Sequence, residues 1–230
     1  MPAGKSLWFR FVRRGIWGIF LAAALMFISA GTLRFWQAWA FLGISLVFPV
    51  MLFVGFQKRD PQLIERRLLK KEKASGQKLV VRLGMLIYLP CYLLPGLDHR
   101  FGWSRTWLAP VPLWLTVLAF AVLLAGQLLT FWVMDVNRFA ARIVQVEAGQ
   151  TVADTGPYRL VRHPMYAASS GMCLGAPLAL GSWVAMPAFW LFILLLVFRL
   201  INEEQTLRRE LPGYTEYCER TRYRLIPGVW

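Results

Sequence analysis

The stretch MYAASSGMCLGAPLALGSWVAMPAFWLFILLLVF, residues 165–198, decides the fold, because it contains 34 residues without a charge. A membrane-spanning helix needs about 20 apolar residues. One helix of this length would run ~51 Å at ~1.5 Å per residue, well beyond the ~30 Å apolar layer of a bilayer. Pro177, Gly181 and Pro187 offer points at which the stretch can break. It therefore predicts two short membrane helices folded as a hairpin around Gly181-Ser182.

Four further runs also lack charged residues: 15–33, 35–56, 83–97 and 106–134. The third run is short, but residues 79–81 extend it and Arg82 can reach the membrane boundary with its long side chain. The chain is 57% hydrophobic and only 17% charged, whereas soluble domains carry about 25% charged residues. The sequence thus predicts an all-α integral membrane protein with about six membrane-embedded helices.

The distribution of basic residues predicts the orientation of these helices. If the N-terminus is cytoplasmic, all of the 26 Lys and Arg residues except Arg34, Arg100 and Arg105 lie in cytoplasmic segments. Such a bias is typical of multi-pass membrane proteins, and it places both termini in the cytoplasm. The net charge of +14 is then explained by topology and by attraction to an anionic lipid bilayer, so we expect no nucleic-acid partner. The cysteines Cys91, Cys173 and Cys218 have no metal-binding or disulfide spacing, and we expect no metal.

We expect one structural unit with two functional parts. Residues 1–134 would form N-terminal transmembrane helices with a basic cytoplasmic loop at 57–82, and residues 135–230 would form the functional core. Within the loop, Asp60 and Pro61 are typical of the start of an amphipathic surface helix. Asp98-His99-Arg100 is interpreted as a turn at the external membrane boundary.

The polar segment GPYRLVRHPMY, residues 156–166, stands directly before the hairpin. Proline disfavours a helical conformation in the residue before it and suits the first turn of a helix, so His163 is predicted to be the N-cap of the following helix. Free backbone N–H groups at such an end favour a carboxylate or a phosphate, and Arg162 adds positive charge. The alternative is a plain helix start with a lipid-phosphate contact.

A second polar cluster, Arg199 with Glu203 and Glu204, follows the hairpin. Ionisable groups at the edge of an apolar layer are costly unless they are paired or functional. Arginine suits a carboxylate and paired carboxylates suit a cationic group, although an intrahelical salt bridge is an equal alternative. Four tyrosines accompany the two clusters. Their rings could stack on a nucleobase or face a sulfonium, but the tail pair is interpreted as ordinary membrane-interface residues: Tyr158, Tyr166, Tyr214 and Tyr217.

Because the two clusters flank a hairpin, both emerge on one side of the membrane. The sequence predicts that they converge into one site at the cytoplasmic leaflet.

The motifs resemble the isoprenylcysteine carboxyl methyltransferase family, whose C-terminal core is shared with phospholipid N-methyltransferases. The resemblance covers residues 137–230 and rests on Gly156-Pro157-Tyr158-Arg159, Val161-Arg162-His163-Pro164 with Tyr166, Arg199-x3-Glu203-Glu204-x2-Leu207, Tyr214-x2-Tyr217 and Pro227. It implies an integral-membrane enzyme that uses S-adenosyl-L-methionine. The cofactor pocket would then be lined by Tyr158, His163, Pro164, Met165 and Tyr166.

The resemblance also implies roles for the residues beyond the pocket. Glu203 would hold the cofactor, at its ammonium group, with Glu204 beside it, and Arg199 would bind the carboxylate of the substrate; Arg199 and Glu203 are thus the catalytic candidates. Gln150, Val152 and Ala153 would also contact the cofactor, although Gln150 and Ala153 depart from the residues usual in the family.

The expected reaction is methyl transfer to a lipophilic small molecule or a lipidated substrate, with a carboxylate as the favoured acceptor. A carboxylate is ionised at neutral pH and needs no general base. Transfer to oxygen, nitrogen or sulfur stays open. The alternatives are an NADPH-dependent reductase of the sterol or steroid type, which carries a similar Arg-His-Pro-x-Tyr segment typically with Asn where this chain has Met165, and a non-enzymatic small transporter.

Overall fold

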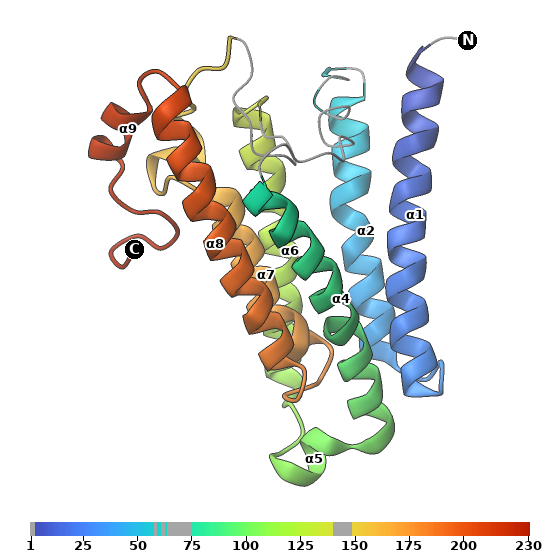
Figure 1. The fold of residues 1–230 in the computed structure, drawn as a ribbon. Coiled ribbons are helices and arrows are strands. Elements are labelled where there is room, and N and C mark those ends of the chain that lie inside the picture. Colours follow the sequence, from blue (N-terminus) through green and yellow to red (C-terminus); the bar gives the residue numbers. More distant parts are fainter. Residues whose placement is uncertain (1–2, 58, 61–62, 64–74, 140–148) are drawn as a thin grey trace.

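The computed structural model describes residues 3–57, 59–60, 63, 75–139 and 149–230. Throughout these ranges the regular structure is helical, which confirms the predicted all-α class (Figure 1). The helices are α1 (Ala3–Ala30), α2 (Trp36–Phe56), α4 (Ser75–Phe101), α5 (Trp103–Trp107), α6 (Leu113–Val136), the 3₁₀ turn η1 (Gly156–Arg159), α7 (Pro164–Ala179), α8 (Met186–Glu210) and α9 (Tyr214–Arg220).

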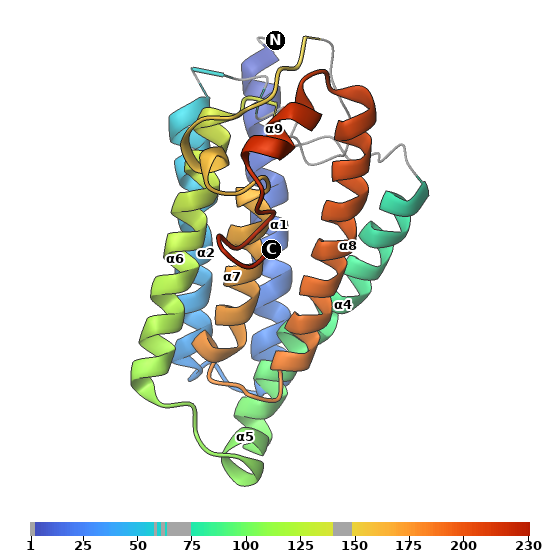
Figure 2. The ribbon, with the colours of Figure 1, turned by 90° about the vertical axis from the view of Figure 1, so that its left-hand side faces the viewer.

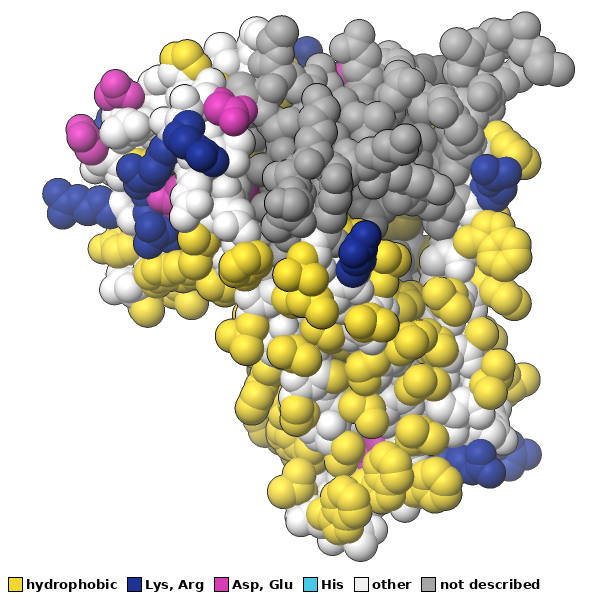
Figure 3. Space-filling model, in the orientation of Figure 1, with side chains coloured by type: hydrophobic (Ala, Val, Ile, Leu, Met, Phe, Trp, Pro, Cys, Tyr) yellow, Lys and Arg dark blue, Asp and Glu magenta, His cyan; other side chains and the backbone are white. Residues whose placement is uncertain are grey.

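The protein is an integral membrane protein. Within the described residues, α2, α6 and α8 are long and apolar enough to cross a bilayer, and α1 contributes a shorter apolar stretch, Gly15–Ala30. Hydrophobic side chains cover the middle of the face shown in Figure 3, as expected for a surface in contact with lipid. A count of six crossings remains a prediction.

The long helices pack in a closed ring. Around it α1 contacts α2, α2 contacts α6, α6 contacts α7, α7 contacts α8, α8 contacts α4, and α4 returns to α1 (Figures 1 and 2). Small residues allow the closest approaches: a Cβ atom on Gly96 of α4 would overlap the Ser29 hydroxyl and the Met26 carbonyl of α1. Such small-residue contacts are the usual means of packing helices in lipid.

The predicted hairpin is present. Helix α7 ends at Ala179 and α8 begins at Met186. Gly181 has a φ of 70°, in the left-handed region that only glycine adopts easily. Pro187 lies in the first turn of α8, where a missing N–H costs nothing, whereas Pro177 lies inside α7 and does not end it.

The expected turn at Asp98-His99-Arg100 is wrong. These residues form the last turn of α4, which ends only at Phe101, before Gly102 with its φ of 69°. Asp98 is buried rather than solvated, because it accepts hydrogen bonds from the Ser104 amide (2.7 Å) and from the hydroxyls of Ser104 and Ser182. It therefore ties α4 and α5 to the turn of the hairpin, at the end of the bundle opposite the polar clusters.

Part of the basic loop is described. The Leu63 amide donates to Asp60 Oδ1 (3.1 Å), which is the bond expected of an N-cap. Arg59 forms an ion pair with Asp135 at the end of α6 (2.7 Å). Pro61 and most of the predicted surface helix lie outside the described residues.

Candidate active site

Helix α7 begins as the sequence predicts, with His163 as its N-cap and Pro164 in its first turn. The side chain of His163 does not cap the helix. Its backbone N–H instead donates to the Arg224 carbonyl (3.0 Å), and the Arg162 N–H donates to the Tyr223 carbonyl (2.8 Å). The end of the chain is thereby fixed against the start of α7.

Glu204 is the centre of a buried charge cluster. The residue is 3% exposed, and its carboxylate lies 3.0 Å from Arg162 Nη1, 2.9 Å from Arg208 Nη2 and 2.8 Å from Arg224 Nε. His163 Nε2 is 3.5 Å away. A buried carboxylate is stable only when such partners replace its hydration. Both oxygens are engaged by protein groups, so Glu204 joins α7, α8 and the C-terminal segment.

Glu203, its neighbour on α8, has different surroundings. The Tyr166 hydroxyl of α7 donates to Glu203 Oε2 (2.6 Å), and the Arg199 guanidinium lies within hydrogen-bonding reach of the same hydroxyl. Tyr166 therefore links Arg199 and Glu203, both of which lie on α8. The carboxylate of Glu203 is only partly buried, so it can accept a further donor from a ligand.

Tyr158 in η1 extends this cluster towards a pocket. Its hydroxyl accepts a hydrogen bond from Asn137 Nδ2 (2.9 Å). Burial raises the pKa of Tyr158 to about 12, and the negative charge of Glu203 contributes in the same direction. The hydroxyl is therefore neutral at physiological pH. The adjoining pocket has a volume of about 280 Å³ and is lined by 136–139 and 151–155, which include Asn137, Val152 and Ala153.

The structure separates the residues that the sequence grouped as cofactor contacts. Val152 and Ala153 line the pocket, whereas Gln150 precedes the lining stretch. Pro164 is fully buried, and Met165 packs on the apolar cluster of Leu52, Phe56, Leu63 and Met134. His163 is also buried, between Glu204 and Tyr214, with its ring edge-on to Tyr166.

The interpretation of Tyr214 and Tyr217 as membrane-interface residues is wrong. Both are buried, in a cluster with Leu211, Cys218, Val152 and Tyr158. The Tyr217 hydroxyl donates to the Tyr158 carbonyl (2.7 Å), so α9 supports η1 from behind. The i, i+3 spacing of the two tyrosines could have indicated one buried helical face. No local pattern points to Asn137 or Arg224.

The region that contains these residues is similar to a known protein family. Residues 114–212 match the family model of phospholipid methyltransferases. This region, which is less than half of the chain, is similar to a phospholipid methyltransferase domain. The matched region begins in α6, includes the hairpin and ends just after α8, so it contains Asn137, Tyr158, Tyr166, Arg199 and Glu203.

Two curated proteins are similar to the chain over part of their length. Delta(14)-sterol reductase TM7SF2 of Mus musculus is 33% identical over 90 residues, which is 38% of this chain and 22% of the reductase. Cobalt-zinc-cadmium resistance protein CzcN of Cupriavidus metallidurans is 26% identical over 121 residues, which is 52% of this chain and 51% of that protein. The matches thus span between about a fifth and a half of the length of these relatives.

Proposed function

We propose that the protein is a membrane-bound, S-adenosylmethionine-dependent methyltransferase that acts on a lipophilic acceptor, with a carboxylate as the favoured acceptor group. The observation that carries the proposal is the Arg199–Tyr166–Glu203 arrangement in the region similar to phospholipid methyltransferases, near Tyr158, which bonds to Asn137 in the lining of a pocket. The site would face the cytoplasm, where the charge bias of the sequence puts both termini.

The groups around the site fit this cofactor. Glu203 would accept the ammonium group of the methionine part, and Asn137 and the neutral Tyr158 hydroxyl offer polar contacts next to it. Val152 and Ala153 would line the nucleoside part of the pocket. Its volume of about 280 Å³ lies just below the ~300–1,000 Å³ usual for ligand sites, so we assign it to one part of the cofactor. When bound, the cofactor supplies an electrophilic methyl group.

We assign Glu204 a positioning role. With three guanidinium groups and His163 around it, its carboxylate has no lone pair left for a ligand ammonium group. It holds Arg162 and His163 at the start of α7, and thereby sets where Tyr166 meets Glu203.

Arg199 would bind the acceptor. A guanidinium group can hold a carboxylate through two parallel hydrogen bonds, which fixes the direction of its oxygens. Tyr166 orients Arg199 and Glu203 relative to each other, so that acceptor and cofactor would lie side by side. The boundary between lipid and water would remove water from the acceptor carboxylate and so make it a better nucleophile.

Mass spectrometry tests the proposal. The purified protein in lipid nanodiscs is incubated with S-adenosylmethionine carrying a deuterated methyl group and with lipid extracts. We expect a lipid-soluble product that carries the label, and none with protein inactivated by heat. The absence of labelled product, combined with oxidation of NADPH by the same preparation, would favour the second candidate, a reductase, which the match to the mouse sterol reductase supports.

A further inference from the structure

The segment after α9, residues 222–230, is a fixed loop. The Tyr223 and Arg224 carbonyls accept hydrogen bonds from the Arg162 and His163 amides, just before α7. Arg224 Nε donates to Glu204. The Leu225 and Ile226 amides donate to the Trp230 carbonyl (2.9 and 3.0 Å), which closes the loop on itself. Its position relative to the helices is therefore set by specific bonds.

The outer face of this loop is apolar. Leu225 points inward and is buried, but Ile226 is 55% exposed and Val229 is 75% exposed. Leu160, in the turn between η1 and α7, is 63% exposed, and Tyr223 is 40% exposed. We call these four side chains the apolar rim. Apolar side chains exposed together on this loop and on the turn bonded to it are unfavourable in water and typical of an interaction surface.

The position of the loop indicates what covers the rim. In both ribbon views the chain end lies at the height of the middle turns of α7 and α8, so the loop has turned back towards the membrane after α9 (Figures 1 and 2). Figure 3 shows hydrophobic side chains along the underside of the lobe that projects beside the bundle, on the side of the lipid-exposed belt. The end of the loop therefore lies near the level of the hydrophobic belt of the helices.

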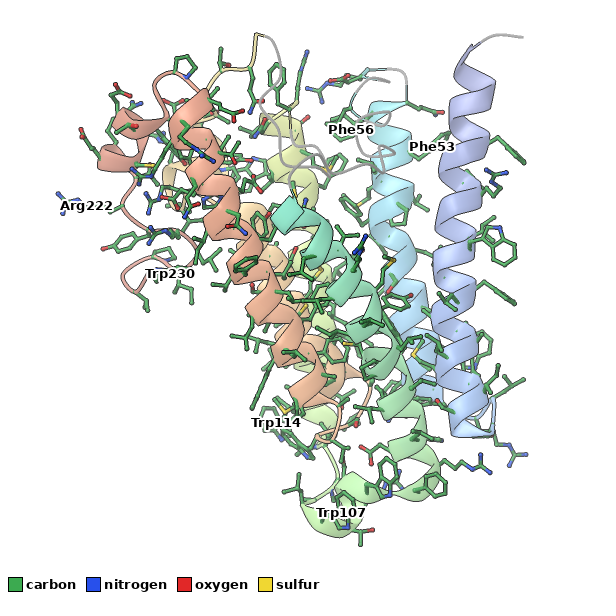
Figure 4. All side chains as sticks on the ribbon, viewed as in Figure 1. Phe53, Phe56, Trp107, Trp114, Arg222 and Trp230 are labelled. Carbon is green, nitrogen blue, oxygen red and sulfur yellow. The ribbon has the colours of Figure 1, made fainter. Side chains whose placement is uncertain are left out.

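Basic and aromatic residues frame the rim. Arg159 and Arg222 are exposed, and Arg222 points away from the bundle in Figure 4, which also shows Trp230 on the lower side of the loop. Exposed arginines next to aliphatic and aromatic side chains suit the boundary of an anionic leaflet, where headgroups bind the guanidinium groups and the apolar side chains enter the acyl region.

We propose that residues 222–230, together with Leu160, form an interfacial anchor that docks on the anionic lipid surface of the leaflet next to the candidate active site. The anchor adds a membrane contact outside the spanning helices. Because the same loop binds the α7 cap and Glu204, docking also holds those residues in place. The proposal does not depend on the identity of the reaction.

Spin-label accessibility in nanodiscs tests the anchor. A nitroxide is attached at Val229→Cys and, as the matched control, at Glu219→Cys on the exposed side of α9. Wild-type protein taken through the same labelling gives the background from the native cysteines, which are buried or partly buried. We expect the label at position 229 to collide more with oxygen, which concentrates in lipid, than with a water-soluble nickel chelate. The control should show the reverse.

The lipid composition and a charge reversal separate the possible partners. Replacement of the anionic lipid by zwitterionic lipid, or the substitution Arg222→Glu, should make the label at position 229 collide less with oxygen and more with the nickel chelate. Equal access of the chelate to positions 229 and 219 would overturn the proposal, because the rim would then lie in water. Protection of position 229 from both reagents, in detergent as well as in nanodiscs, would also overturn it, because a protein surface would then cover the rim.

Discussion

Glu203 and Glu204 are adjacent on α8, but their side chains meet opposite environments. Glu204 points into the protein, where three arginines and His163 enclose it. Glu203 turns towards Tyr166 and remains partly exposed. The sequence marks both as a carboxylate pair, yet only the packing of the C-terminal segment shows which of the two is available to a ligand.

For Glu203→Gln we expect weaker binding of S-adenosylhomocysteine, because the neutral amide no longer attracts the ligand ammonium group. A hydrogen bond to a charged group contributes about 1.5–3 kcal/mol, so the dissociation constant should rise roughly 10- to 150-fold. Isothermal titration calorimetry measures the change. Glu210→Gln, the same substitution at the exposed end of α8, is the control and should bind like wild type. An equal loss in both variants would contradict the assignment of Glu203.

For Glu204→Gln we expect a loss of stability. The substitution leaves the buried Arg162 without its countercharge, and removal of one partner of a buried ion pair costs about 3–5 kcal/mol. A lower unfolding temperature in detergent, compared with wild type and with Glu203→Gln, is the readout. The double variant Glu204→Gln with Arg162→Met removes both charges and should recover part of the loss. If Glu204→Gln were as stable as Glu203→Gln, the charge cluster would not stabilise the fold.

At the scale of elements, the contact between α1 and α4 depends on a missing side chain. Gly96→Ala would place a methyl group against the backbone of α1, and overpacking of this kind costs about 1–3 kcal/mol. We expect a lower unfolding temperature. Among the residues that the structure describes, the methyl group added in the control Gly84→Ala, on the same helix, meets only Phe192 at 3.8 Å, and alanine is the better helix former. A loss of equal size in both variants would mean that close packing at Gly96 is not the cause.

Long uncharged runs made most elements predictable. In the hydrocarbon of a bilayer, a single segment can satisfy its backbone hydrogen bonds only by forming a helix. The hairpin followed from the length of its run and from Gly181. Asp98 misled the prediction, since a charged residue at the end of an apolar run is normally solvated, while here serines from two other elements bind it. Helix α9 and η1 are short and depend on tertiary contacts between Tyr217 and Tyr158.

For the molecule as a whole, the sequence predicted that two polar clusters converge, and the Tyr166–Glu203 and Arg162–Glu204 bonds show this convergence. The prediction was possible because a hairpin returns both of its ends to one side. The contributions of Asn137 and Arg224 could not be predicted. Each bonds to a residue far away in the sequence, Tyr158 or Glu204, and no local sequence pattern marks either of them. The roles of the converged residues remain proposals.

Orientation is a further prediction at this scale. Arg105 in α5 and Glu216 in α9 are exposed at opposite ends of the bundle. With the site in the cytoplasm, a membrane-impermeant maleimide should label Arg105→Cys in intact cells, and Glu216→Cys only after permeabilisation. Wild-type protein supplies the background labelling. The reverse pattern would place the site on the outer face, away from the cytosolic pool of S-adenosylmethionine.

The most direct test of the account is an experimental structure of the protein in nanodiscs with S-adenosylhomocysteine. We expect ligand density between Glu203 and the pocket lined by Val152 and Ala153, with the ammonium group at the Glu203 carboxylate. Ligand density at the opposite end of the bundle, near Asp98, or density for NADPH but none for S-adenosylhomocysteine, would contradict it.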